Sequence, residues 1–225
     1  MIKIVFDNVT KGSLWGFSLY MEKYKLLFDT GSNGRVLLKN LQKEGVNVKE
    51  IEYLFISHSH WDHIGGIDSI LELNPNITMF VPNSLSKYLI KDLRTLTKEV
   101  VVCEGFAKLF DRVYTTGVLG EEMPEQSLLI DAKESILITG CGHFGADRIV
   151  EVAKNELKKD ISVLIGGFHL LSKSDKEISK MANSLKNLGV KKVVPTHCTG
   201  EKAFKIFQDI YGKDYCKEGG IGRVV

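Results

Sequence analysis

Short apolar runs alternate with stretches in which aliphatic residues recur at helical spacing, and this pattern predicts strands alternating with helices. The apolar runs predict strands over residues 2–6, 16–22, 25–29, 53–57, 77–81, 127–131, 135–139, 162–168, 192–195 and 221–225, with β-rich sequence over 99–117. The helical spacing predicts helices over residues 33–44, 67–73, 83–93, 145–158, 174–188 and 201–211.

Two kinds of connection are expected between these strands. The runs at 16–22 and 25–29 are close enough for an antiparallel hairpin, as are those at 127–131 and 135–139, whereas other strands are separated by a helix. Hairpins mixed with strand–helix–strand units favour an α/β (α+β) fold of two mixed sheets packed face to face, with helices on the outer faces. No linker, repeat or low-complexity segment interrupts the pattern, so we expect a single domain over residues 1–225.

The composition and net charge of the chain limit the classes of binding partner that we expect. The chain has 225 residues, is 44% hydrophobic and 26% charged, and carries a net charge of +2 without a long basic run, so we expect no nucleic-acid partner. Its apolar stretches are far shorter than the roughly 20 residues of a membrane helix, so we expect no membrane partner. The first residues lack the features of a signal peptide, and we therefore expect a cytoplasmic protein that acts on a small molecule, with its oligomeric state left open.

The four cysteines are widely and irregularly spaced, at positions 103, 141, 198 and 216, and none forms a C-x-x-C pair. This spacing argues against an iron–sulfur cluster or a structural zinc ribbon. Cys141 and Cys198 differ from the other two because each lies next to or near a histidine.

The segment SHSHWDH holds His58, His60, Asp62 and His63, so that half of the six histidines in the chain lie within six positions. It directly follows the apolar run at 53–57. In an extended chain His58 and His60 point to the same side, while Asp62 and His63 follow as the chain turns. Imidazole nitrogen and carboxylate oxygen suit Zn²⁺, with Mn²⁺ or Fe²⁺ as alternatives, and the segment could serve two adjacent ions. Trp61 is expected to be a packing or pocket-wall residue.

The other three histidines also follow apolar runs. His143 lies in TGCGHFG, His169 in IGGFHL and His197 in PTHCTG. All six histidines are therefore expected at the carboxyl ends of strands, where open sheets place their functional sites. None is expected within a helix.

The H-x-H-x-D-H segment, the preceding strand end Asp29-Thr30-Gly31 and the following Gly65-Gly66 resemble the metallo-β-lactamase superfamily. This resemblance covers nearly the whole chain and implies a four-layer αββα sandwich with two divalent metal ions. By the same resemblance, the ligands of the first metal would be His58, His60 and His143, and those of the second would be Asp62, His63 and His197. By the same resemblance, Asp29 would orient the metal-binding loop without binding a metal itself.

A narrower resemblance rests on WGFSLY, LLFDTGSNG, TGCGHFG, IGGFHL and PTHCTG. Together these segments resemble the branch named for 7,8-dihydropterin-6-methyl-4-(β-D-ribofuranosyl)aminobenzene-5'-phosphate synthase. Many members of this branch are known only as metal-dependent hydrolases.

One position departs from the superfamily pattern. Most members have Thr-Gly-Asp, with an aspartate that bridges the metals, where this chain has Thr139-Gly140-Cys141. Cys141 could coordinate as a thiolate, or it could be a small buried thiol while solvent alone bridges the metals. His169 has no standard ligand role, and two alternatives remain open. It could face the substrate as a proton donor or phosphate contact, or it could be a hydrogen-bonded histidine at a strand end.

These features predict a metal-dependent hydrolase that uses a metal-bound hydroxide on a small, anionic or phosphorylated ester-type substrate. Asp62 could accept the proton and His169 could contact the substrate. The first alternative is a transferase that condenses a dihydropterin diphosphate with an aryl-amine ribose phosphate. The second is a non-enzymatic metal or redox sensor that uses Cys141 and Cys198.

Overall fold

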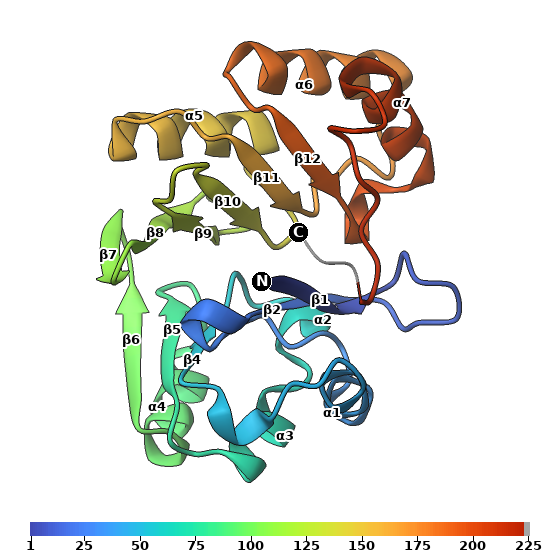
Figure 1. Cartoon of the computed structure of the whole chain (residues 1–225). Helices are drawn as coiled ribbons and strands as arrows, with labels where there is room; N and C mark the ends of the chain where they lie inside the picture. Colours follow the sequence, from blue (N-terminus) through green and yellow to red (C-terminus); the bar gives the residue numbers. More distant parts are fainter. Residues whose placement is uncertain (223–225) are drawn as a thin grey trace. The chain divides into compact units, whose positions relative to one another are not determined.

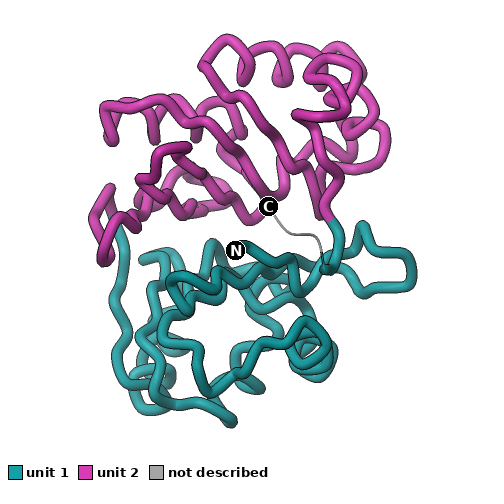
Figure 2. The backbone as a smooth tube through the Cα atoms, viewed as in Figure 1, with its two compact units in different colours: residues 1–104, 220–225 teal, residues 105–219 magenta. Residues whose placement is uncertain are grey.

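The computed structural model describes residues 1–222 and divides the chain into two compact units (Figure 2). Unit 1 comprises residues 1–104 together with the segment that begins at Gly220, and unit 2 comprises residues 105–219. The single domain expected over residues 1–225 stays a prediction.

Unit 1 contains a six-stranded mixed sheet in sequence order, from β1 to β6. Its strands are β1 (Ile2–Asp7), β2 (Phe17–Met21), β3 (Leu26–Phe28), β4 (Tyr53–Phe55), β5 (Thr78–Pro82) and β6 (Glu99–Cys103). The first three pair antiparallel, and β3 to β6 pair parallel. The helices are α1 (Gly34–Lys43), α2 (Trp61–Ile64), α3 (Ile67–Leu73) and α4 (Lys87–Leu96), with 3-10 turns at Glu22–Tyr24 and Val48–Glu50 (Figure 1).

The core of unit 1 forms because alternate strand residues face the amphipathic helices. Leu27, Leu54 and Met79 from the sheet pack in one cluster with Leu37 of α1 and Ile70 of α3. The α1 helix begins where the sequence predicts, because the Asn33 side chain accepts a hydrogen bond from the N–H of Val36 and caps the first turn.

Unit 2 contains a second six-stranded mixed sheet, in the order β12-β11-β10-β9-β8-β7. Its strands are β7 (Ala107–Phe110), β8 (Val113–Leu119), β9 (Glu125–Ile130), β10 (Ile136–Thr139), β11 (Val163–Gly166) and β12 (Lys192–Pro195). The strands from β7 to β10 pair antiparallel and those from β10 to β12 pair parallel. Its helices are α5 (Ala146–Leu157), α6 (Asp175–Asn187) and α7 (Glu201–Tyr211), with a 3-10 turn at His197–Thr199.

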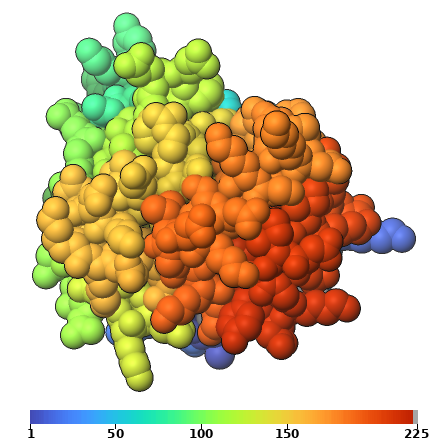
Figure 3. Space-filling view, turned by 90° about the horizontal axis from the view of Figure 1, so that it is seen from above, coloured from blue at the N-terminus to red at the C-terminus, as the bar shows by residue number. Residues whose placement is uncertain are grey.

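The three long helices of unit 2 cover one face of its sheet (Figure 1), and they form a continuous surface from yellow to red in Figure 3. Leu137 and Leu164 from the strands pack with Ile149 of α5, Ile178 of α6 and Phe207 of α7. The α6 helix starts with a capping box between Ser174 and Glu177, each of which hydrogen-bonds the backbone N–H of the other.

The α/β class expected from the sequence is confirmed, with two mixed sheets and their helices, and most elements lie within a few residues of the expected ranges. The α4 helix begins four residues later than expected because Asn83 and Leu85 donate backbone hydrogen bonds to Cys103 and Pro82 in a turn. Of the strand expected over 221–225, residues 221 and 222 form a turn and the other three lie outside the described residues. Among residues 1–222, no helix is both long enough and apolar enough to cross a bilayer.

Candidate metal centre

The histidine segment of unit 1 begins just past the end of β4. His58 lies in the connection, His60 is the residue before α2, and Asp62 and His63 lie in the first turn of that short helix. His58 and His63 are buried, Asp62 is only 5% exposed, and His60 is half-buried. The expected turn at Asp62 and His63 is a single helical turn, so the expectation that no histidine lies within a helix is wrong for His63.

A buried hydrogen-bond chain fixes the orientation of two of these histidines. Asp29 lies directly after β3, and its Oδ2 accepts from the Ser57 hydroxyl at 2.6 Å and from His63 Nδ1 at 2.6 Å. Since the hydroxyl of Ser57 has a single proton and gives it to Asp29, His58 Nδ1, which is 2.9 Å from that oxygen, must be the donor to it. With Asp29 ionised, His58 and His63 therefore both carry their lone pair on Nε2.

The spacing of the ring nitrogens fits a shared cation. His58 Nε2 lies 3.0 Å from His60 Nδ1. Two nitrogens bound to one tetrahedral Zn²⁺ at about 2.0–2.1 Å lie roughly 3.3 Å apart. The tautomer that Ser57 imposes on His58 directs a lone pair to this place, so the donor set of unit 1 fits a divalent metal. His58 and His60 do point to the same side, as the sequence predicts.

Close backbone contacts hold this loop against the rest of unit 1. The backbone N–H and the hydroxyl of Thr30 both donate to the carbonyl of His63, at 2.7 and 2.9 Å. Gly16 has a φ of +138°, and a Cβ there would lie 2.6 Å from the carbonyl oxygen of Asp62. Only glycine fits both this conformation and this approach.

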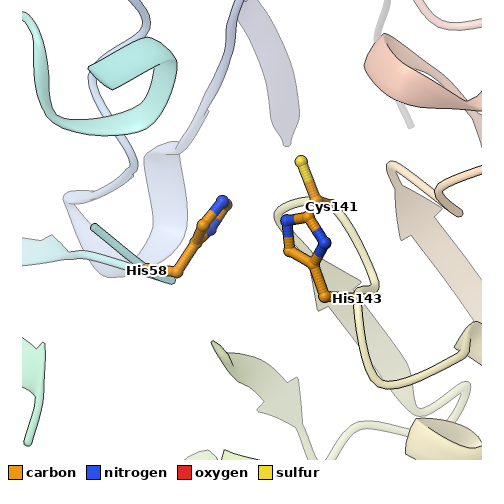
Figure 4. A group of neighbouring side chains, drawn as sticks. All are labelled: His58, Cys141 and His143. Carbon is orange, nitrogen blue, oxygen red and sulfur yellow. The ribbon is translucent and has the colours of Figure 1, made fainter. Parts of the chain in front are cut away.

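In unit 2, a buried glutamate organises the loop that follows β10. Glu125 is 2% exposed, and its Oε1 accepts from the N–H groups of Gly140, Cys141 and Gly142 at 2.9, 3.0 and 3.1 Å. Its Oε2 accepts from the N–H of His143 at 3.0 Å. Four consecutive amides thus surround one carboxylate, and they fix the backbone of the loop on which Figure 4 shows Cys141 and His143.

Cys141 and Cys198 are buried and reduced, and they approach each other around Gly167. Cys198 Sγ lies 3.5 Å from the carbonyl oxygen of Cys141. A Cβ on Gly167 would lie 2.6 Å from the same sulfur, so the missing side chain makes room for the thiol. Burial by itself would raise the pKa of Cys198, but hydrogen bonds with Cys141 and His169 and the charge of His197 together hold this pKa well below its usual value.

His169 and His197 follow β11 and β12, as the sequence predicts. Among residues 1–222, six non-glycine residues have positive φ, and three of them are site candidates: Asp29, His169 and His197, each with φ of +51°. Such conformations often mark functional positions. His197 is buried, whereas His169 is exposed and its pKa is raised, chiefly by its hydrogen bond with Cys198.

Two parts of the site were not found in the sequence, and one expectation was partly wrong. Glu125 lies in polar sequence just before the apolar run at 127–131, and only its distance from the loop in three dimensions reveals its role. Ser57 is the first residue of SHSHWDH, but the sequence alone indicates no function for it. Trp61 is 62% exposed, so it is not a packing residue of unit 1.

Residues 19–101 match the family model of the metallo-beta-lactamase superfamily. The 7,8-dihydropterin-6-methyl-4-(beta-D-ribofuranosyl)-aminobenzene-5'-phosphate synthase of Methanocaldococcus jannaschii is 28% identical over 242 residues, which cover 86% of this chain and 81% of that protein. The first match includes the loop with His58, His60, Asp62 and His63.

Solved structures show the same fold. Tm1679, described as a metal-dependent hydrolase of the beta-lactamase superfamily, superposes with a TM-score of 0.78 at 29% identity, over 94% of this chain and 93% of that one. The metallo-beta-lactamase fold protein YhfI from Bacillus subtilis gives a TM-score of 0.70 over 99% of this chain and 97% of its own. At 15% identity, YhfI is evidence for the fold alone.

Proposed function

Because the chain belongs to the metallo-β-lactamase superfamily, we propose that it is a metal-dependent hydrolase of a small, anionic or phosphorylated ester. The main support is the buried hydrogen-bond chain through which Asp29 and Ser57 keep Nε2 of His58 and His63 as the lone-pair nitrogen. The similarity to Tm1679, which is described as a metal-dependent hydrolase, supports the reaction class.

The proposed ligands of two divalent ions, Zn²⁺ or else Mn²⁺ or Fe²⁺, are His58, His60, Asp62 and His63 of unit 1 and His143 and His197 of unit 2, with Cys141 as a further candidate. A bound divalent metal lowers the pKa of water and polarises an ester oxygen. The carboxylate of Asp29 fixes the ring of His63 before any cation arrives, and Glu125 fixes the backbone of the loop that carries His143.

Two side chains are proposed to move protons. Asp62 is buried, its Oδ2 lies 3.7 Å from His63 Nε2, and it can accept a proton from the attacking water. His169 is exposed at the wall of a cavity and can donate a proton to the leaving group.

The test compares Asp62→Asn and His60→Ala with the wild-type protein. Each is expected to lower kcat/KM for an activated ester about 10²–10⁴-fold and to reduce the metal content measured by atomic absorption. Asp68→Asn is the matched control, because Asp68 is an exposed aspartate in the first turn of α3, outside the loop. Full hydrolytic activity in metal-free protein would contradict the proposal.

A second candidate function is supported by the similarity to the synthase of M. jannaschii. The chain would then join a dihydropterin diphosphate to an aryl-amine ribose phosphate, with diphosphate as the leaving group, instead of cleaving an ester. Incubation with a dihydropterin diphosphate and the aryl-amine ribose phosphate, followed by mass spectrometry, separates the two functions. A coupled product in the absence of ester hydrolysis favours the transferase.

A further inference from the structure

A cavity of about 630 Å³ lies in unit 2 beside His143 and His169. Its walls come from the connection between β8 and β9, with Glu121 and Glu122, from Phe144 in the turn before α5, and from Arg148 in the first turn of that helix. Cavities of roughly 300–1,000 Å³ bind small ligands. The charged side chains that line this cavity indicate the charge of the ligand that it can bind.

Arg148 is exposed at this wall, and its guanidinium group lies over an aromatic ring. The centre of its guanidinium group lies 3.9 Å from the centroid of the Phe144 ring. A guanidinium that stacks on an aromatic face keeps its N–H donors at its edge, in the plane where carboxylates and phosphates bind with two hydrogen bonds. Among residues 1–222, no carboxylate forms an ion pair with Arg148, although two glutamates line the same cavity.

The acidic side of the cavity limits the charge of the ligand. Glu121 and Glu122 are exposed on the connection before β9, and within the described chain neither forms a salt bridge. A ligand with many negative charges would be repelled by this pair, whereas one with a single anionic group can bind Arg148 and point its neutral part toward the glutamates. The rings of His169 and of the candidate metal ligand His143, with centroids 4.4 Å apart, line the same cavity.

We propose that Arg148, held by Phe144, binds the oxyanion group of a small substrate with one anionic group, a phosphate or a carboxylate. Glu121 and Glu122 exclude polyanions from the same cavity. Arg148 is thus a specificity-determining residue, and the identification of its ligand as the substrate rests on the proposed function.

The experiment titrates inorganic phosphate, and separately acetate, into the metal-loaded and the chelator-treated protein by calorimetry. We expect Arg148→Met to weaken the binding of one or both anions at least about tenfold, Arg148→Lys to weaken it less, and Phe144→Leu to weaken it about threefold. Arg35→Met is the matched control, since Arg35 is an exposed arginine in the first turn of α1, and it should leave the affinities unchanged.

Equal affinities in Arg148→Met and the wild-type protein, or no binding of either anion by the wild-type protein, would overturn the proposal. Stronger binding of oligophosphate than of phosphate would also refute the role of the two glutamates. Metal-dependent hydrolysis of a neutral and of a monoanionic activated ester by the wild-type protein is measured separately. If anion binding depends on Arg148 but no metal-dependent reaction occurs, the proposed function fails while the anion site stands. If hydrolysis occurs but anion binding ignores Arg148, only the anion site fails.

Discussion

Replacing Glu125 by glutamine tests whether one buried carboxylate holds the loop with Cys141 and His143. The substitution keeps the shape of the side chain but replaces one acceptor oxygen with an NH₂ donor. If the remaining oxygen takes the Oε1 position, it keeps the N–H groups of Gly140, Cys141 and Gly142. The new NH₂ group then faces the N–H of His143, 3.0 Å from the original acceptor.

The expected loss of stability follows from the four hydrogen bonds that Glu125 accepts. A hydrogen bond to a charged group contributes about 1.5–3 kcal/mol and one to a neutral group about 0.5–1.5 kcal/mol, so three bonds weaken. The fourth donor loses its acceptor inside the protein, which costs about 1–3 kcal/mol. Relief from burying a carboxylate offsets part of this loss. The bonds share one acceptor group and do not add, so we expect the free energy of unfolding to fall by about 2–4 kcal/mol.

The assay is urea unfolding followed by circular dichroism, together with hydrogen exchange of the amides at 140–143. Glu125→Gln should unfold at lower urea and exchange these amides faster, and it should bind metal more weakly because the loop is less ordered. Glu122→Gln is the control, because Glu122 is exposed nearby and its substitution should change stability by less than about 0.5 kcal/mol. Wild-type stability and unchanged exchange in Glu125→Gln would refute the reasoning.

Four further outcomes are expected. Asp29→Asn should weaken metal affinity about 10- to 100-fold in a competition titration, because its one amide oxygen cannot serve both the Ser57 N–H, which binds Oδ1, and the Ser57 hydroxyl and His63 ring, which bind Oδ2; asparagine tolerates the positive φ. Gly16→Ala should destabilise the protein by about 2–4 kcal/mol, whereas Gly12→Ala, which has positive φ but open space around its Cβ, should lose only about 1 kcal/mol in the same urea assay. Chelation should lower the melting temperature measured by calorimetry, and Zn²⁺ should restore it. Burial raises the pKa of Cys103 from 9.0 to about 11, so the folded state holds this proton more tightly. The contribution of this thiol to the free energy of unfolding is present in full below pH 9, and roughly 2–3 kcal/mol of it is lost as the pH rises to 11. Cys103→Ala should not show this loss.

The sequence predicts the histidine loop well because its information is local. The ligand types recur within six positions and follow an apolar run, and the residue alternation of an extended chain already places His58 and His60 on one side. Glu125 could not be found in this way, because its four partners lie 15 to 18 residues farther along the chain. Nothing in its own neighbourhood distinguishes it from a solvated glutamate at a strand end. Only the pairing of β9 with β10 brings it under the loop.

In both units, a buried carboxylate orders the loop that carries the candidate ligands. Each has a loop at the carboxyl end of a strand with weak structure of its own: α2 is a single turn of four residues, and the loop after β10 contains Gly140 and Gly142. An isolated turn is unstable in water, and glycine loses more conformational entropy than any other residue when it is ordered. A buried carboxylate compensates in both cases, Asp29 through the ring of His63 and the backbone of Ser57, and Glu125 through four amides. The candidate ligands are therefore oriented by the protein itself, so that a cation would bind with little further ordering of the loops.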